Sequence, residues 1–286
     1  RAAAGLPERM NDGPLSLSET RELLARLAHM PKKWLGQNFL VDGNIVRKSL
    51  ELGEVKPGDT VVEVGPGLGT LTRTLLGAGV NLFAVEADRT MVYHLETTLK
   101  PRHPKTFHLH EGDAVDFPRA GLTDATDGSF KVIANLPYAI STPWMDAICA
   151  GPHPSLMVLM LQREAADRLT AEVGTGHWSA VTAQVQLAFE RVKLHPVPAQ
   201  SFNPPPKVDS CLLVLRRRAD ARRLSPRARE VARMLFTQRR KQVGSAARKL
   251  FPDQADVARW LEALPAFGVT SLARPETIPA EAWLTL

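Results

Sequence analysis

Short apolar runs alternate with amphipathic segments over the first two thirds of the chain. The apolar runs have the length of buried strands, and the segments between them have the apolar spacing of helices. The predicted strands are 60–64, 81–86, 106–110, 130–134 and 155–161, and the predicted helices are 44–52, 70–76 and 89–99. This alternation predicts an α/β fold with a Rossmann-like, doubly wound and mostly parallel sheet.

The pattern changes at both ends of this region. Residues 16–29 predict a short helix capped by Ser16 or Ser18. Residues 164–192 predict a helix interrupted at 174–176, residues 195–198 and 203–206 predict loops, and 208–215 predict a last strand that closes a terminal hairpin. Composition shifts at 216–218, so we expect an N-terminal extension at 1–30, a catalytic domain at 31–215 and a small all-helical domain at 216–286.

The positive charge of the chain lies in its C-terminal part. Residues 216–286 hold 15 Lys and Arg against 7 Asp and Glu, a net charge of +8, whereas the other 215 residues have a net charge of −2. Such an asymmetry indicates a polyanion partner, and nucleic acid is the common one. The candidates for RNA contact are Arg239, Arg240 and Lys241. A second group is Lys32, Lys33 and Trp34, although solvated helix or loop residues have the same composition.

Composition also excludes several classes of protein. No apolar stretch approaches the length of a membrane span and no signal peptide is visible, so we expect a cytoplasmic protein with no membrane partner. Cys149 and Cys211 are too few for a disulfide framework or a four-sulfur metal site. His103, His108 and His110 lack carboxylate or thiolate partners at ligand spacing, and we expect no metal.

A glycine-rich turn, Glu63-Val-Gly-Pro-Gly-Leu-Gly69, separates a predicted strand from a helix. Gly65 and Gly67 allow a tight turn and the close approach of a ligand, and the helix start offers free N–H groups. Glu86 ends the next strand and can bind ribose hydroxyls, while Asp113 follows the third strand and can accept a hydrogen bond from an adenine amine. Each feature alone is also typical of an ordinary turn or loop. Together, at the carboxyl ends of successive parallel strands, they predict a site for one nucleoside.

The segment Asn135-Leu-Pro-Tyr138 follows the fourth strand. An adenine N6 is a poor nucleophile, because its lone pair is delocalised into the ring. The Asn135 side-chain oxygen and the Leu136 carbonyl can hold the two N6 hydrogens and direct the lone pair at a methyl sulfonium. Pro137 would fix the loop, and Tyr138 offers a face for a flipped base. The alternative is a strand-ending turn with a packed tyrosine, but the position after a nucleoside-binding sheet favours catalysis by alignment.

The chain resembles the KsgA-type small-subunit rRNA adenine N6-dimethyltransferases from about residue 33 to its end. The resemblance is carried by the segments Gly36-Gln-Asn-Phe-Leu40, Glu63 to Gly69, Ala134-Asn-Leu-Pro-Tyr138, Ile140-Ser-Thr-Pro143, Leu161-Gln-Arg-Glu164, Phe202-Asn-Pro-Pro-Pro-Lys-Val-Asp-Ser210, Phe236-Thr-Gln-Arg-Arg-Lys241 and Arg274-Pro-Glu276. Trp178-Ser179 and Lys241-Gln-Val-Gly-Ser245 depart from the usual pattern, which is Tyr-Gly at the first place and Lys-Thr-Leu-x-Asn at the second.

This resemblance implies a class I methyltransferase that uses S-adenosylmethionine to dimethylate two adjacent adenosines near the 3′ end of small-subunit (16S) rRNA during ribosome biogenesis. It implies cofactor contacts at Asn38, Leu40, Gly65, Glu86, Asp113 and Asn135, with the pre-30S particle as partner. It also places the Phe202 ring beside the target base, opposite Tyr138. Without the resemblance, Phe202 would be interpreted as a buried loop anchor. We expect a monomer.

Two other functions fit part of this pattern. A related enzyme dimethylates one large-subunit rRNA adenine and confers resistance, but residues 204–206 and 236–241 favour the small-subunit type. A nucleic-acid-binding factor on a methyltransferase fold is the second alternative. Intact Glu86, Asp113 and Asn135 argue against it, because binding alone does not require them.

Overall fold

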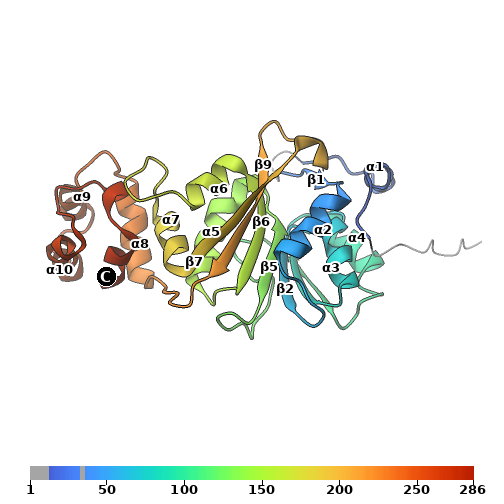
Figure 1. Cartoon of the computed structure of the whole chain (residues 1–286), viewed down its shortest axis with the longest axis horizontal. Coiled ribbons are helices and arrows are strands. Elements are labelled where there is room, and N and C mark those ends of the chain that lie inside the picture. Colours follow the sequence, from blue (N-terminus) through green and yellow to red (C-terminus); the bar gives the residue numbers. More distant parts are fainter. Residues whose placement is uncertain (1–12, 33–35) are drawn as a thin grey trace, which may run out of the picture.

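A computed structural model of the chain describes residues 13–32 and 36–286. Its centre is a seven-stranded sheet with the strand order β4-β3-β2-β5-β6-β9-β7 (Figure 1). The strands from β4 to β6 are parallel, and β9 runs antiparallel to both β6 and β7. The strands are β2 (Thr60–Val64), β3 (Asn81–Glu86), β4 (Phe107–Glu111), β5 (Lys131–Asn135), β6 (Leu156–Gln162), β7 (Phe189–Val197) and β9 (Ser210–Arg217). The predicted doubly wound, mostly parallel α/β fold is confirmed.

Helices cover both faces of the sheet because the central strands are apolar on both faces. Neighbouring residues of one strand belong to different cores: Val132 lies in the core with the α5–α7 side chains, and Ile133 lies in the core with the α2–α4 side chains. The first helix layer is α2 (Gly43–Leu52), α3 (Thr70–Gly77) and α4 (Arg89–Thr98); the second is α5 (Ser141–Ala150), α6 (Arg163–Leu169) and α7 (Ala180–Ala188).

The N-terminal helix α1 (Leu17–Arg26) begins at Ser16, whose hydroxyl accepts a hydrogen bond from the Glu19 N–H while Glu19 accepts one from the Ser16 N–H. This reciprocal cap confirms Ser16 as the helix start. Leu23 and Leu24 pack with Met91 of α4 in a small separate core. The helix therefore docks beside the start of α4, in a core that it shares with Phe39 of the segment that follows it.

Two very short strands join distant parts of the sequence. Strand β1 (Phe39–Leu40) pairs antiparallel with β8 (Phe202–Asn203), so that Leu40 lies opposite Phe202. The pair brings the segment before the sheet against the Phe202-Asn-Pro-Pro-Pro segment. Two-residue strands carry too little periodicity to be seen in the sequence, and both were expected to be loop.

One predicted helix is wrong at its end. Residues 164–192 were expected to be helical, but α7 ends at Ala188 and β7 begins at Phe189. The predicted loop at 195–198 is also mostly strand, because β7 continues to Val197. The register of β7 on β9 shifts between Arg191 and Lys193, which breaks the alternation of side chains. A proline at 196 is tolerated because β7 is an edge strand. The predicted terminal hairpin is the β7–β9 pair.

The C-terminal part is helical, as expected, and has its own core. It contains α8 (Pro226–Phe236), α9 (Val243–Leu250) and α10 (Ala255–Ala263), followed by short 3₁₀ turns at Leu264–Phe267, Pro275–Thr277 and Ala280–Thr285. Trp260 stacks on Trp283 at a ring-centroid distance of 4.8 Å in the middle of this core. Figure 1 shows these helices at the far end of the molecule from α1–α4.

Helix α7 belongs to both parts of the molecule. Val181 and Val185 pack in the sheet core, whereas Ala183 and Leu187 pack in the core of the C-terminal helices. Trp178, one of the unusual residues in the sequence, is buried in that second core, where its Nε1 donates to the Ile278 carbonyl at 3.1 Å. The division at 1–30, 31–215 and 216–286 stays a prediction, and residues 1–12 lie outside the described residues.

Candidate active site

A pocket opens at the carboxyl ends of β2, β3, β4 and β5, which is where ligands of open α/β sheets bind. It contains about 1110 Å³ of empty space, including solvent at its mouth, which is the size of a small-molecule site. Each predicted cofactor residue lines it. The walls are formed by residues 36–40, 63–68, 70–71, 85–87, 112–114 and 135–140.

The glycine-rich turn packs directly against the Asn135–Tyr138 loop. Gly65 has a φ of +67°, and a Cβ at this position would lie 3.5 Å from the Pro137 Cδ. Gly67 has a φ of +56°, and its N–H donates to the Glu86 Oε2 at 3.0 Å. The left-handed backbone at these positions requires glycine, and no side chain stands between Gly65 and the loop or between Gly67 and the Phe39 ring.

Glu86 is held in place by backbone groups at the end of β3. Its Oε2 accepts from Gly67, and its Oε1 accepts the N–H of Asp88 at 2.8 Å. Burial raises the pKa of this carboxyl, and the N–H donors act against burial. A carboxyl group held in this way still has lone pairs for the hydroxyls of a ribose.

Asp113 is exposed at the pocket rim, after β4. Its Oδ1 accepts the Val115 N–H at 2.8 Å, which fixes the side chain in a turn. This contact leaves the other carboxylate oxygen for a ligand. The geometry agrees with the predicted contact to an adenine amine, which stays a prediction.

Asn135 and Leu136 lie at the end of β5. The Asn135 Nδ2 donates to the Asn38 carbonyl at 3.2 Å. This bond orients the amide, and no described residue donates to the Asn135 Oδ1. Leu136 buries its side chain and donates its N–H to the Met160 carbonyl at 3.2 Å. The loop is thus held from both sides while two carbonyl-type oxygens stay available as acceptors.

Tyr138 is half-buried and begins the 3₁₀ turn Tyr138–Ile140. Its hydroxyl forms a 2.8 Å hydrogen bond with the Ser210 Oγ, and burial raises its pKa. The phenol is therefore neutral and fixed at its tip. The ring lines the pocket, where a base can stack against it.

Phe202 does not line the pocket. It is buried at 3% exposure, opposite Leu40 in the β1–β8 pair and within the core beside α2–α4. The structure therefore places it as the buried loop anchor that its sequence context alone suggests. A position beside the target base stays a prediction, which needs the side chain or the β8 segment to move.

The N-terminal segment contributes Asn38 and Leu40 to the pocket, as predicted. Asn38 donates its side-chain amide to the Gly36 carbonyl at 3.2 Å and accepts from Asn135 with its own carbonyl. Gly36 has a φ of +65° and lies against Tyr138. Trp34 and Lys33 lie outside the described residues.

Two further acidic groups of the site were not expected from the sequence. Glu63 lines the pocket at 1% exposure, and burial, reinforced by the negative charge of Glu86, raises its pKa to about 8. Asp88 lies behind Glu86 and contacts the N-terminal segment. The sequence signal for Glu63 is an acidic residue inside an otherwise apolar strand. Asp88 had no signal beyond its position at a helix start.

His108, His110 and Arg239 have local partners. His108 stacks on Phe83 and His110 on Phe117, with centroid distances of 4.4 and 4.0 Å. Within residues 13–32 and 36–286, no group of His, Cys, Asp or Glu is arranged to hold a metal ion. In the same residues, every helix is too short or too polar to cross a bilayer. Arg239 donates to the Gly176 carbonyl, whereas Arg240 and Lys241 are exposed.

A parallel sheet of this order with a nucleoside-sized pocket at its carboxyl edge is the fold of class I methyltransferases. The model of the ribosomal RNA adenine dimethylase family matches residues 28–284. The chain belongs to this family, and it is an rRNA adenine dimethyltransferase.

Similar proteins cover nearly the whole chain. A ribosomal RNA small subunit methyltransferase A from Opitutus terrae is 55% identical over 273 residues, which are 96% of this chain and 98% of that protein. Another of the same name from Laribacter hongkongensis is 36% identical, covering 90% of this chain and 95% of that protein.

Two solved structures have the same fold. A dimethyladenosine transferase from Plasmodium falciparum matches with a TM-score of 0.65 at 24% identity, over 86% of this chain and 95% of that one. The 23S rRNA methyltransferase ErmE matches with a TM-score of 0.58 at 28% identity, over 87% and 97%.

Proposed function

We propose that this protein transfers methyl groups from S-adenosylmethionine to N6 of two adjacent adenosines near the 3′ end of small-subunit rRNA, on a pre-30S particle. The observation that carries the proposal is the meeting of the Asn135–Tyr138 loop and the glycine-rich turn at one pocket. Gly65 packs on Pro137 there, so the acceptors for an amine face the same space as the nucleoside-binding acids.

The hydrogen-bond acceptors of the pocket fit S-adenosylmethionine. Glu86 has free lone pairs for the ribose hydroxyls, and Asp113 has a free carboxylate oxygen for the adenine amine. Gly65, Asn38 and Leu40 supply backbone and apolar contacts at the same walls.

S-adenosylmethionine supplies a methyl group on a positively charged sulfur. The chain's own residues act on the amine that receives it. Asn135 Oδ1 and the Leu136 carbonyl accept the two N6 hydrogens, which makes the nitrogen pyramidal and aims its lone pair at the methyl group. Tyr138 supports the base by stacking. Most of the acceleration then comes from alignment and from acceptors that are oriented before the substrate arrives.

The relatives support the small subunit as the substrate. The two relatives above, at 55% and 36% identity, carry the name ribosomal RNA small subunit methyltransferase A. The +8 charge of residues 216–286 gives the enzyme a surface that attracts RNA phosphates. A cytoplasmic monomer is the form that we propose for it.

The test incubates the protein with radiolabelled S-adenosylmethionine and either small-subunit particles or large-subunit rRNA. We expect label in the small-subunit RNA only, mapped as N6,N6-dimethyladenosine at two adjacent positions near the 3′ end. Label confined to large-subunit RNA would assign the protein to the resistance type. Tight RNA binding without any label in either substrate would favour a binding factor.

A further inference from the structure

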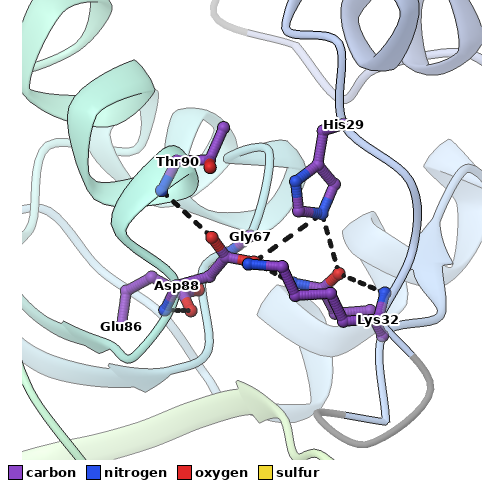
Figure 2. Close-up of polar contacts among 7 residues, drawn as sticks. His29, Lys32, Gly67, Glu86, Asp88 and Thr90 are labelled. Atoms are coloured by element: carbon purple, nitrogen blue, oxygen red, sulfur yellow. Dashed lines mark hydrogen bonds and ion pairs between the residues drawn. The ribbon is translucent and has the colours of Figure 1, made fainter.

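Asp88 connects the N-terminal segment, which contains His29, Lys32 and Gln37, to the carboxyl edge of the sheet. Its side chain is fully buried at the start of α4, where Oδ1 accepts the Thr90 N–H at 3.0 Å. The other oxygen, Oδ2, accepts from the Gln37 Nε2 at 2.8 Å and pairs with the Lys32 Nζ at 3.0 Å. Figure 2 shows this carboxylate between α4 and the segment that carries His29 and Lys32.

Gln37 is the counterpart of Asp88 in the N-terminal segment. Its Oε1 accepts the Lys32 N–H at 2.8 Å and contacts the His29 Nε2 at 2.9 Å, while its Nε2 donates to Asp88. The His29 ring, itself buried, lies 3.7 Å from Asp88. The Gln37 amide therefore connects two parts of the N-terminal segment with each other and with Asp88, next to the sheet.

The same aspartate also supports the proposed ribose contact. The Asp88 N–H donates to the Glu86 Oε1, and the other oxygen of Glu86 accepts from Gly67. A chain of hydrogen bonds therefore runs from Gln37 through Asp88 and Glu86 to the glycine-rich turn. Burial would raise the pKa of Asp88, but hydrogen bonds from Lys32, Gln37 and Thr90 lower it, so the carboxylate is charged.

We propose that Asp88 is a positioning residue for the cofactor, which holds residues 36–40 against the pocket through Gln37 and fixes Glu86 through its own backbone. Residues 36–40 form one wall of the pocket, and Asn38 in turn orients Asn135. Helix α1 is docked by Leu23, Leu24 and Met91 without Asp88. Loss of the carboxylate therefore loosens residues 36–38 of the wall, whereas Phe39 and Leu40 stay held by that core and by the β1–β8 pair.

The inference rests on the proposed function, because it assumes that S-adenosylmethionine occupies the pocket. The variants are chosen to separate the contact of Asp88 with Gln37 from its role as the N-cap of α4. Asp88→Ser keeps an N-cap oxygen for Thr90 but is too short to reach Gln37. Gln37→Met removes the same bond from the other side at nearly constant volume, together with the contacts of Gln37 to Lys32 and His29. Asp256→Ser is the matched control, since Asp256 pairs with Arg227 in the C-terminal region.

The experiment measures the Kd of S-adenosylmethionine by calorimetry, and kcat on small-subunit particles at saturating cofactor. We expect Asp88→Ser and Gln37→Met each to raise Kd about tenfold, the scale of one charge-assisted hydrogen bond. We expect kcat to stay within about twofold, and the loss of affinity in the double variant to be smaller than the two single losses added together, because each single variant already lacks the bond between Gln37 and Asp88. Asp88→Asn keeps one acceptor oxygen for Thr90 but turns an NH2 group toward Gln37 and Lys32, so it should not restore the affinity.

A wild-type Kd in both folded single variants would overturn the inference, and so would a fall in kcat with Kd unchanged. If Asp88→Ser does not fold, Gln37→Met alone decides the question. If Asp256→Ser raises Kd as much as Asp88→Ser and Gln37→Met do, the effect is a general loss of stability, and the inference is overturned. Failure of the proposed function has a different signature, since the wild type itself would then not bind S-adenosylmethionine.

Discussion

Glu63 gives a prediction whose size can be worked out from its surroundings. The side chain is 1% exposed at the floor of the pocket, and burial raises its pKa from 4.5 to about 8. Between these two pH values, the unfolded chain has lost the proton of Glu63 while the folded protein keeps it. Stability contributed by the protonated form is therefore complete below pH 4.5 and is lost as the pH rises to 8, at about 1.4 kcal/mol per pH unit.

Glu63→Gln removes this dependence because an amide has no proton to lose. We expect the free energy of unfolding of the variant, minus that of the wild type, to rise by about 2 kcal/mol between pH 6 and pH 8. Urea unfolding followed by tryptophan fluorescence at several pH values measures this difference. Glu96→Gln, on the exposed face of α4, is the control and should show no such rise.

A difference between Glu63→Gln and wild type that stays constant from pH 5 to pH 9 would refute the reasoning. It would mean that Glu63 is ionised in the folded protein over the whole range, with a partner for its charge. A rise of the same size in Glu96→Gln would show that the effect comes from general charge repulsion.

Three further predictions test other parts of the structure. Asn135→Ala should reduce methyl transfer by several orders of magnitude while the Kd of S-adenosylmethionine changes less than about tenfold, since the side chain aligns the amine; turnover at the wild-type rate would contradict this role. Gly65→Ala should lower the free energy of unfolding by about 1–2 kcal/mol, because φ is +67° there; chemical denaturation measures it, and an unchanged midpoint would show that the turn relaxes. Asp146→Ala should cost about 2 kcal/mol in the same assay, because it leaves Arg229 of α8 without its 3.1 Å partner; a loss equal to that of an exposed Asp variant would contradict this value.

Most of the sheet was predictable from the sequence because its parallel strands are buried on both faces. Strands β2 and β3 have the predicted ends, since a run such as Thr60–Val64 is bounded by polar turns. The edge strand β7 was not predictable. Its side chains from Glu190 to Lys193 are exposed, and the shift near Arg191 removes the period of two. Helical spacing in α7 therefore extended the predicted helix by four residues.

The cofactor wall was predictable from spacing, but its supports were not. Glu86 and Asp113 each follow a strand, so the order of the strands alone brings them to one edge. The contact between Gln37 and Asp88 joins residues 51 positions apart through a loop whose path no periodic pattern encodes. For Phe202, the resemblance implies a position beside the target base. Its buried position opposite Leu40 was not predictable, because it depends on a strand pair of only two residues.

The double use of α7 has a consequence for the RNA. The helix packs on the sheet with one face and on the C-terminal helices with the other, so a shared helix connects the basic part of the chain to the part that carries the pocket. If residues 216–286 hold rRNA phosphates as proposed, this packing sets the distance between the phosphates and the base that is methylated. The rRNA must then change its own conformation to bring an adenosine into the pocket. Only an adenosine at the right distance from the bound phosphates can reach the Asn135–Tyr138 loop. Selection of the target adenosine would thus depend on its distance from the bound phosphates more than on contacts with neighbouring bases.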